Sequence, residues 1–236
     1  MKNVICVEHP LSEHSLTILR DRSTLTADFK QRTQIVTNIL FAEATRSLAV
    51  KEKTVSTPLT DMTGHIIKDN IILVPVLRAG LAMLFAAQQF VPWATAGFIG
   101  LERDEETAIA REYYQKFPEH LSKKKTIILD PMLATGGSLL STISALYDKG
   151  ASDIEIICIV AAPEGCELIA NHYPDIKIYT AALDSHLNDQ KIHCARTGRF
   201  RRPVFWYRLN HERLQSPDRG GGRSNSSSLL IHYGRS

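Results

Sequence analysis

The sequence predicts an α/β fold in which a mostly parallel central β-sheet is flanked by helices. Short runs rich in β-branched residues alternate along the chain with stretches whose apolar residues recur at three- and four-residue spacing. Such alternation of strand and helix produces a parallel sheet. The chain has 236 residues, of which 44% are hydrophobic, and this is enough for one substantial core. Ligands of such folds bind at the carboxyl ends of the strands.

The expected elements follow one another from residue 27 to residue 180. A first amphipathic helix is expected over Ala27–Val50, where Phe29, Val36 and Leu40 share one face. The expected strands are Ile71–Val74, Ala96–Leu101, Thr126–Leu129, Ile154–Val160 and Ile178–Thr180. The expected helices between them are Leu81–Phe90, Ser138–Asp148 and Glu164–His172. The strand-to-loop junctions expected to carry the site are Pro75, Glu102 and Asp130.

Residues 125–140, KTIILDPMLATGGSLL, combine an apolar strand, an acid at its end, a loop of small residues and a helix. The two glycines let backbone amides close around a phosphate, and Thr135 and Ser138 add hydroxyl donors at a helix N-terminus. Asp130 can accept hydrogen bonds from two vicinal hydroxyls of a ribose. No lysine follows the glycines, which disfavours the loop of nucleotide triphosphatases. The alternative is a strand, a proline turn and a helix cap that bind no ligand.

The stretch DPMLATGGS is similar to the signature with which type I phosphoribosyltransferases bind 5-phosphoribosyl 1-diphosphate (PRPP). Its Asp-Pro pair, in place of two adjacent acids, resembles the uracil phosphoribosyltransferases. Further stretches that resemble this family are PVLRAGL, LERDEET, YYQKFP, AAPEG and YTAALDSHLN. Together they span residues 1–190. The resemblance implies the type I phosphoribosyltransferase fold, with a mobile hood or β-arm.

The resemblance also implies roles for individual residues. Asp130, Arg78 and Arg103 are the expected catalytic residues, the two arginines holding the pyrophosphate. The expected PRPP-binding residues are these three together with Pro131, Met132, Leu133, Ala134, Thr135, Gly136, Gly137 and Ser138. The alternative for either arginine is a solvated surface ion pair. Residues 105–118 resemble the hood, whose Tyr113 and Tyr114 either belong to the lid or serve packing or a subunit interface.

The activity that the resemblance implies is transfer of ribose 5-phosphate from PRPP to N1 of uracil, which gives UMP and diphosphate in pyrimidine salvage. Mg²⁺ is expected to be carried mainly by PRPP, with no metal site built from protein ligands alone. The other expected partners are a GTP activator, as in some family members, and further copies of the chain in a dimer or tetramer. Two alternatives stay open: a non-catalytic PRPP-binding regulator of the same fold, and a transferase for another base.

After Asn188 the chain departs from the family pattern. The family continues into a glycine-rich segment resembling YIVPGLGDAGDRLFGT, whereas this chain reads KIHCARTGRFRRPVFWY. Codons for residues 191–207, taken one base out of register, can spell YIVPGLGDSGDRFFG. We therefore hypothesise a one-base insertion near Lys191, in the gene or in its sequencing. The family's uracil-binding positions are then occupied by His193, Gly198, Arg199 and Phe200, and uracil binding is expected to be impaired.

Composition divides the chain into a body and a tail. Residues 1–190 hold 18 basic and 23 acidic side chains, and residues 191–236 hold 10 and 2. The expected organisation is a phosphoribosyltransferase domain over 1–209, departing from the family over 191–209, and a disordered basic tail over 210–236. The four cysteines show no paired spacing, and no long apolar stretch occurs. A cytoplasmic protein that binds neither membrane nor nucleic acid is therefore expected.

Overall fold

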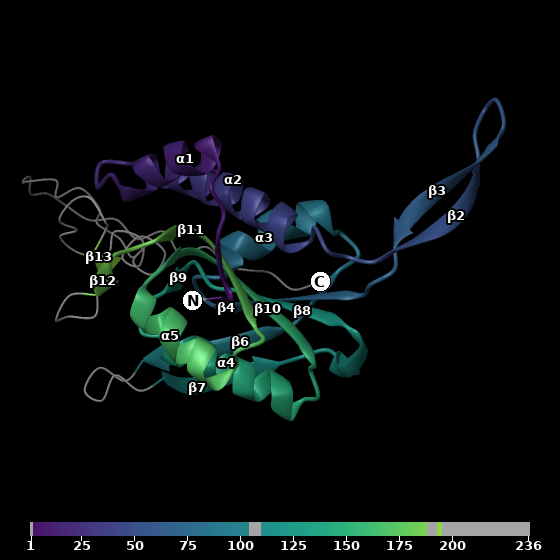
Figure 1. The fold of residues 1–236 in the computed structure, drawn as a ribbon. Helices are drawn as coiled ribbons and strands as arrows, with labels where there is room; N and C mark the ends of the chain where they lie inside the picture. Colours follow the sequence, from purple (N-terminus) through teal and green to yellow (C-terminus); the bar gives the residue numbers. More distant parts are fainter. Residues whose placement is uncertain (1, 104–109, 188–192, 195–236) are drawn as a thin grey trace, which may run out of the picture.

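The computed structural model describes residues 2–103, 110–187 and 193–194. A twisted β-sheet forms the middle layer of the molecule (Figure 1). Its main strands lie in the order β1 (Val4–Cys6), β11 (Lys177–Leu183), β10 (Asp153–Ala161), β8 (Lys125–Leu129), β4 (Ile71–Leu77), β6 (Phe98–Arg103) and β7 (Ala110–Lys116). All neighbours are parallel except β6 and β7. The predicted class, a mostly parallel sheet flanked by helices, is confirmed.

Helices cover both faces of this sheet (Figure 1). One face carries α1 (Pro10–Arg20), α2 (Thr26–Ala44) and α3 (Leu81–Phe90), and the other carries α4 (Gly137–Asp148) and α5 (Pro163–His172). Strand β4 shows why two layers are needed, because its side chains alternate between two buried cores. Ile71 and Leu73 pack with α2 and α3, whereas Ile72 and Val74 pack with α4.

The order of the strands creates a switch point between β4 and β8. These strands are direct neighbours, with Pro75 paired to Leu129, although β6 lies between them in the sequence. From β4 the chain continues through α3 to β6 on one side, and from β8 through α4 to β10 on the other. The two connections leave the carboxyl ends of β4 and β8 in opposite directions. In open α/β sheets, ligands bind in the crevice at such a switch point.

Most predicted elements are confirmed, with shifts at their ends. The helix predicted over Ala27–Val50 ends at Ala44, because the chain turns there and Val50 begins strand β2 (Val50–Ser56). Leu48 still packs against the core from this turn, which prolongs the apolar spacing beyond the helix. Residues 96–101, predicted as one strand, divide at Gly97 into β5 (Thr95–Ala96) and β6. Both pair with β4, and the Gly97 N–H between them donates to the Leu73 carbonyl oxygen.

Two of the three predicted strand-to-loop junctions are displaced. Strand β4 runs past Pro75 to Leu77, and Glu102 lies inside β6, one residue before its end. Pro75 lies opposite Leu129 of β8 and has no N–H to donate to a ladder. Only Asp130 follows its strand, β8, as predicted.

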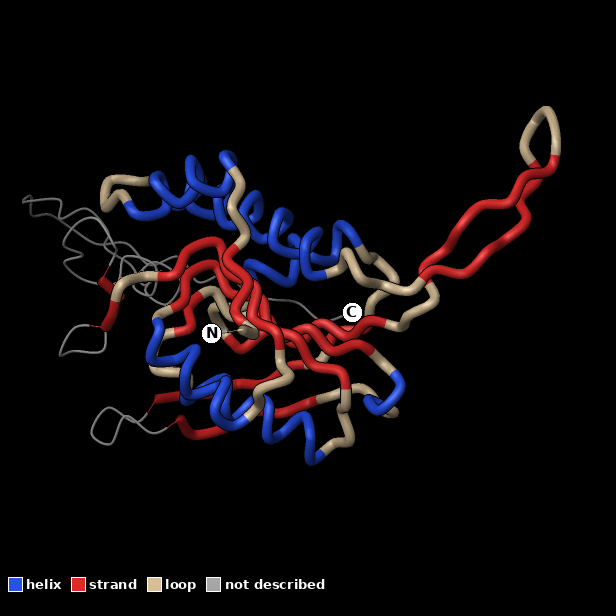
Figure 2. Tube along the Cα trace, in the orientation of Figure 1, coloured by secondary structure: helices blue, strands red, loops and turns tan. Residues whose placement is uncertain are grey.

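A hairpin that the sequence did not predict as an element projects from the body (Figure 2). It consists of β2 and β3 (Asp61–Ile67), and every residue of β2 is exposed. Large apolar side chains exposed on it are Val50, Val55, Leu59, Met62 and Ile66. A two-stranded hairpin is marginally stable alone in water. We call this hairpin the arm.

None of the helices within the described ranges has both the length and the apolar character that crossing a bilayer requires.

Candidate functional site

Asp130 stands directly after β8, at the switch point. Its backbone N–H donates to the Ile157 carbonyl oxygen at 3.2 Å, and its Oδ1 accepts from the Met132 N–H at 3.3 Å. The side chain is only partly exposed. Desolvation by the surrounding protein raises the pKa of the Asp130 carboxyl to about 7, against the opposing effect of the Met132 N–H. The Asp130 carboxyl can therefore accept hydrogen bonds through both of its oxygens mainly when it is ionised, which occurs near neutral pH.

The phosphate loop, defined here as residues 131–138, leads from Asp130 into α4. Its first half forms β9 (Met132–Leu133), which pairs with β10. Gly136 then adopts a left-handed conformation, with φ 84°, and caps α4, which begins at Gly137. The free N–H groups and the partial positive charge of this helix start face the loop. Among the described residues, no hydrogen-bond partner occupies the hydroxyls of Thr135 or Ser138. The loop therefore offers several donors to one anion.

A second loop, carrying Arg78, lies beside Asp130. Arg78 is exposed and follows β4, and the Leu77–Arg78 peptide bond is cis. Gly80 is buried, and a β-carbon built on it would lie 2.3 Å from the Leu129 carbonyl oxygen. Only glycine lets this loop pack so closely on the end of β8. The structure thus brings the predicted residues Arg78 and Asp130 to the same crevice.

The predicted hood begins where β6 ends. Arg103 is the last residue of β6, where it pairs with Ala110 of β7; its side chain and residues 104–109 lie outside what the structure describes. Gly100 pairs with Tyr114 and Leu101 with Glu112, so Tyr113 is the extra residue of a β-bulge. The Tyr113 ring lies over Gly100, where an added β-carbon would meet its Cζ at 2.5 Å. The two tyrosines were expected to belong to the lid or to serve packing or a subunit interface, and the structure shows a packing contact for Tyr113.

The chain leaves β11 at the same edge of the sheet. There Asp184, which is 4% exposed, accepts from the Arg20 guanidinium of α1 at 2.7 Å, and its N–H donates to the Ala161 carbonyl oxygen. Beyond it, β12 (His186–Leu187) pairs with β13 (His193–Cys194). Of the predicted uracil positions, the structure describes only the backbone of His193, and Gly198, Arg199 and Phe200 lie outside the described residues.

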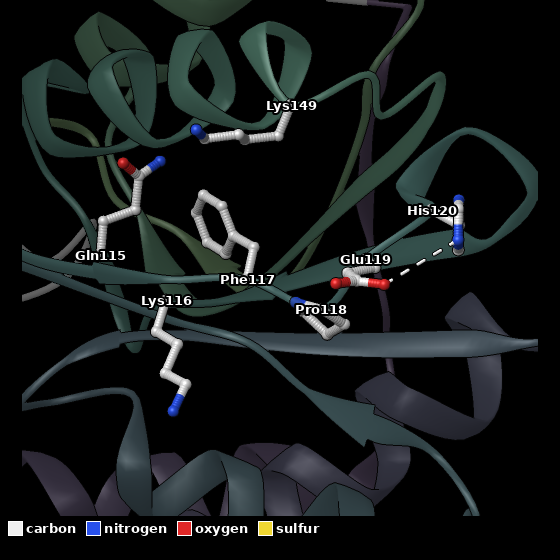
Figure 3. Close-up of a pocket in the computed structure, with 7 residues that line it drawn as sticks. All are labelled: Gln115, Lys116, Phe117, Pro118, Glu119, His120 and Lys149. Carbon is white, nitrogen blue, oxygen red and sulfur yellow. Dashed lines mark ion pairs between the residues drawn. The ribbon is translucent and has the colours of Figure 1, made fainter.

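A cavity of about 480 Å³ lies elsewhere, lined by Gln115, Lys116, Phe117, Pro118, Glu119, His120 and Lys149 (Figure 3). Lys149 follows the last residue of α4, whereas the phosphate loop meets its first residue. In the close-up Lys149 extends over Phe117 toward Gln115, and Lys116 points away. The cavity is therefore separate from the crevice between β4 and β8.

Sequence reasoning missed one feature of the site, the hydrogen bonds that join the phosphate loop to the end of β10 and to the β10–α5 connection. The Pro131 carbonyl oxygen accepts from the N–H groups of Ile159 and Val160, and the Ala162 N–H donates to the Leu133 carbonyl oxygen at 2.8 Å. One signal was present in the sequence: Gly165 lies in α5, two residues after the proline that begins it, although glycine disfavours a helix. Its contact with the loop could be seen only in three dimensions.

The fold and the site define a doubly wound α/β protein with a candidate sugar-phosphate site at its switch point, and comparison with known proteins specifies its family. The profile of the family described as uracil phosphoribosyltransferase matches residues 6–200. Uracil phosphoribosyltransferases of Dictyoglomus thermophilum and Brevibacillus brevis are 46% and 40% identical over 79% and 80% of the chain, and over 90% and 91% of their own lengths. The structure of the AQ2163 protein from Aquifex aeolicus matches with a TM-score of 0.76 at 33% identity, over 80% of this chain and 90% of that one. The chain belongs to the uracil phosphoribosyltransferase family.

The raised pKa of Asp130 predicts a pH-dependent cost in stability. The carboxyl titrates at about 7 in the folded chain and near 3.8 when unfolded, so the folded state holds the extra proton between these values. The free energy of unfolding should therefore fall as pH rises from about 4 to about 7. Asp130→Asn removes this titration. The difference in the free energy of unfolding, variant minus unchanged chain, should therefore be about 2 kcal/mol larger at pH 8 than at pH 4, after allowance for partial exposure.

Urea unfolding of both chains at pH 4, 6 and 8 measures this difference. Other titrating groups are common to the two chains and cancel in the comparison. A constant difference across the three pH values would show that Asp130 ionises normally.

Proposed function

We propose that this chain is a uracil phosphoribosyltransferase, which transfers ribose 5-phosphate from PRPP to N1 of uracil in pyrimidine salvage. The observation that carries the proposal is the meeting of Asp130, the phosphate loop and the Arg78 loop at the switch point between β4 and β8. The printed names of relatives that are 40–46% identical to the chain support uracil as the accepting base.

Each part of the crevice has a distinct task in this proposal. The phosphate loop and the start of α4 bind the 5-phosphate, and the ionised Asp130 accepts hydrogen bonds from the two ribose hydroxyls. Arg78 binds the diphosphate through its guanidinium fork. Arg103 and the hood are proposed to complete the diphosphate site and to exclude water. In this proposal sugar, phosphate and leaving group are held by residues at the carboxyl ends of three adjacent strands, β8, β4 and β6.

The reaction breaks the bond between C1 of the ribose and the diphosphate, which leaves with the electron pair. N1 of uracil forms the new bond to C1, and the proton of N1 is lost. No covalent intermediate with the protein is required. Catalysis comes from holding the two reactants in line and from neutralising the leaving diphosphate with Arg78.

Mg²⁺ is proposed as the metal, bound mainly through oxygens of PRPP. Within the described ranges, His, Cys, Asp and Glu side chains form no group of three that could hold a metal ion. The site instead offers the single Asp130 carboxylate next to the place of the sugar hydroxyls. A hard cation with a preference for oxygen ligands suits this donor set when substrate supplies the remaining oxygens. The ion would add charge neutralisation at the diphosphate.

The uracil half of the site depends on residues 191–207, and the frame hypothesis stays a prediction. A pocket built from glycine backbone would be replaced by His193, Arg199 and Phe200, so that uracil turnover would fall while PRPP binding persists. This would make the chain a PRPP-binding protein without transfer activity, as in the regulatory alternative. A GTP activator and a cytoplasmic location also remain predictions; free thiols at Cys6, Cys158 and Cys166 support the latter.

UMP formation from uracil and PRPP, beside hypoxanthine and orotate, tests the proposed activity. A second chain carries residues 191 onward translated in the other frame. We expect uracil, but neither hypoxanthine nor orotate, to be converted. The kcat/KM for uracil should be at least tenfold higher in the second chain than in the given chain. In that chain Arg78→Ala should lower kcat/KM by about 10²-fold, whereas Arg46→Ala, which alters an exposed arginine, should not. Turnover of hypoxanthine or orotate in preference to uracil, in either chain, would refute the proposal.

A homo-oligomer built through the arm is the proposed quaternary state. The arm exposes Leu59 at 96% and Met62 at 51%, and every residue of β2 is exposed. Exposed aromatic side chains also lie on α3 or shortly after it, namely Phe85, Phe90 and Trp93. Apolar surface of this kind marks contact sites between proteins. A second copy of the chain would shield the arm and stabilise its two strands.

Charge placed on the arm should dissociate this oligomer. The double variant Leu59→Asp, Met62→Asp is expected to sediment as a monomer at micromolar concentration, because the carboxylates would have to be buried without partners. Leu11→Asp, which places one such carboxylate on an exposed position of α1, is the control and should keep the unchanged state. Sedimentation velocity of the three chains decides the point. Identical masses for all three would exclude the arm as the contact.

A further inference from the structure

The first turn of α5 lies against the second half of the phosphate loop. A β-carbon built on Gly165 would stand 2.3 Å from the Ala134 carbonyl oxygen and 2.7 Å from Leu133 Cδ1. In the reverse direction, a β-carbon on Gly136 would stand 3.0 Å from the Gly165 carbonyl oxygen and 3.1 Å from Leu168 Cδ2. The backbones of Gly136 and Gly165 therefore face each other with no side chain between them.

The two glycines are needed for different reasons. Gly136 has φ 84°, and this left-handed conformation alone favours glycine. Gly165 has no such φ and lies inside a helix, where glycine costs about 1 kcal/mol relative to alanine. Its own backbone conformation gives no reason for glycine. The close approach of the Ala134 carbonyl is the feature that excludes every larger residue at position 165.

A side chain at this contact would move the loop and leave the helix in place. Helix α5 is fixed by Cys166 and Ile169, both fully buried in the core beneath it. On the loop side, Ala134 and Thr135 are partly exposed. The less tightly packed partner gives way. The displaced atoms would be those between Asp130 and the first amides of α4.

We propose that Gly165 is a positioning residue for the phosphate loop. It lets the backbone from Ala134 to Gly136 rest on α5 and so fixes the direction in which the amides of Gly136, Gly137 and Ser138 point. This role rests on the proposed function, in which those amides bind the 5-phosphate of PRPP. Gly165 itself touches no substrate and acts only through the loop.

The variant Gly165→Ala tests the role, with Gly64→Ala as the matched control. A β-carbon on Gly64 would meet its nearest atom at 3.7 Å, which is ordinary contact. We expect Gly165→Ala to weaken PRPP binding at least tenfold by calorimetry in Mg²⁺, because misplacement by about 1 Å costs up to about 10²-fold. In the chain with restored frame, KM for PRPP should rise while KM for uracil changes less than twofold. The control should change neither.

Amide hydrogen exchange at residues 134–139 provides a readout that needs no ligand. Faster exchange there in Gly165→Ala than in Gly64→Ala, with the rest of the chain unchanged, supports the positioning role even if the unaltered chain fails to bind PRPP, a result that would refute only the proposed function. Unchanged exchange and unchanged PRPP affinity would overturn the inference.

A second variant covers the case in which Gly165→Ala does not fold. Leu168→Ala keeps Gly165 and adds no atoms, yet removes the side chain that packs on Gly136 from the same helix. It should weaken PRPP binding and speed exchange at residues 134–139 in the same direction, by a smaller factor. A Leu168→Ala chain with normal exchange and affinity, beside an unfolded Gly165→Ala chain, would assign Gly165 to folding alone and contradict the proposal.

Discussion

The direct pairing of β4 with β8 is the constraint on which the rest of the site depends. Because Pro75 lies opposite Leu129, β8 ends beside the last residues of β4, which continues to Leu77, while α3 and α4 carry the chain away over opposite faces. The strand order alone therefore places the switch point between these two strands. Arg78 and Asp130 then need only follow their strands to meet at one ligand.

Close backbone contacts convert this crevice into a shaped site. Gly80 brings the Arg78 loop onto the Leu129 carbonyl, and Gly165 seats the phosphate loop on α5. Burial desolvates Asp130 and raises its pKa, so its carboxyl stays protonated up to about pH 7. In the proposed function, hydrogen bonds from the ribose hydroxyls favour the ionised form. The positions of the two loops thus depend on close backbone contacts, and the raised pKa of Asp130 depends on its burial.

Local patterns predicted the strand and the helix that flank the proposed phosphate site, because its strand, acid, glycines and helix are consecutive in the sequence. Elements without a plain apolar pattern escaped prediction. Helix α1 buries Ser12 and Ser15 beside Leu16 and Leu19, so its buried face is part polar, and the arm buries no face at all. The contact at Gly165 joins residues about thirty positions apart, which no local pattern contains. The uracil half could not be compared, since most of it lies outside the described residues.

Calorimetric titration of the full chain with PRPP and Mg²⁺, at pH 6 and pH 8, tests the central claim most directly. The account predicts one PRPP per chain and binding about tenfold tighter at pH 8, because a carboxyl with pKa about 7 is then ionised. In Asp130→Asn, binding should be weaker and should keep only the pH dependence of the ligand itself. Equal affinity and equal pH dependence in the two chains would contradict a sugar-phosphate site built around Asp130.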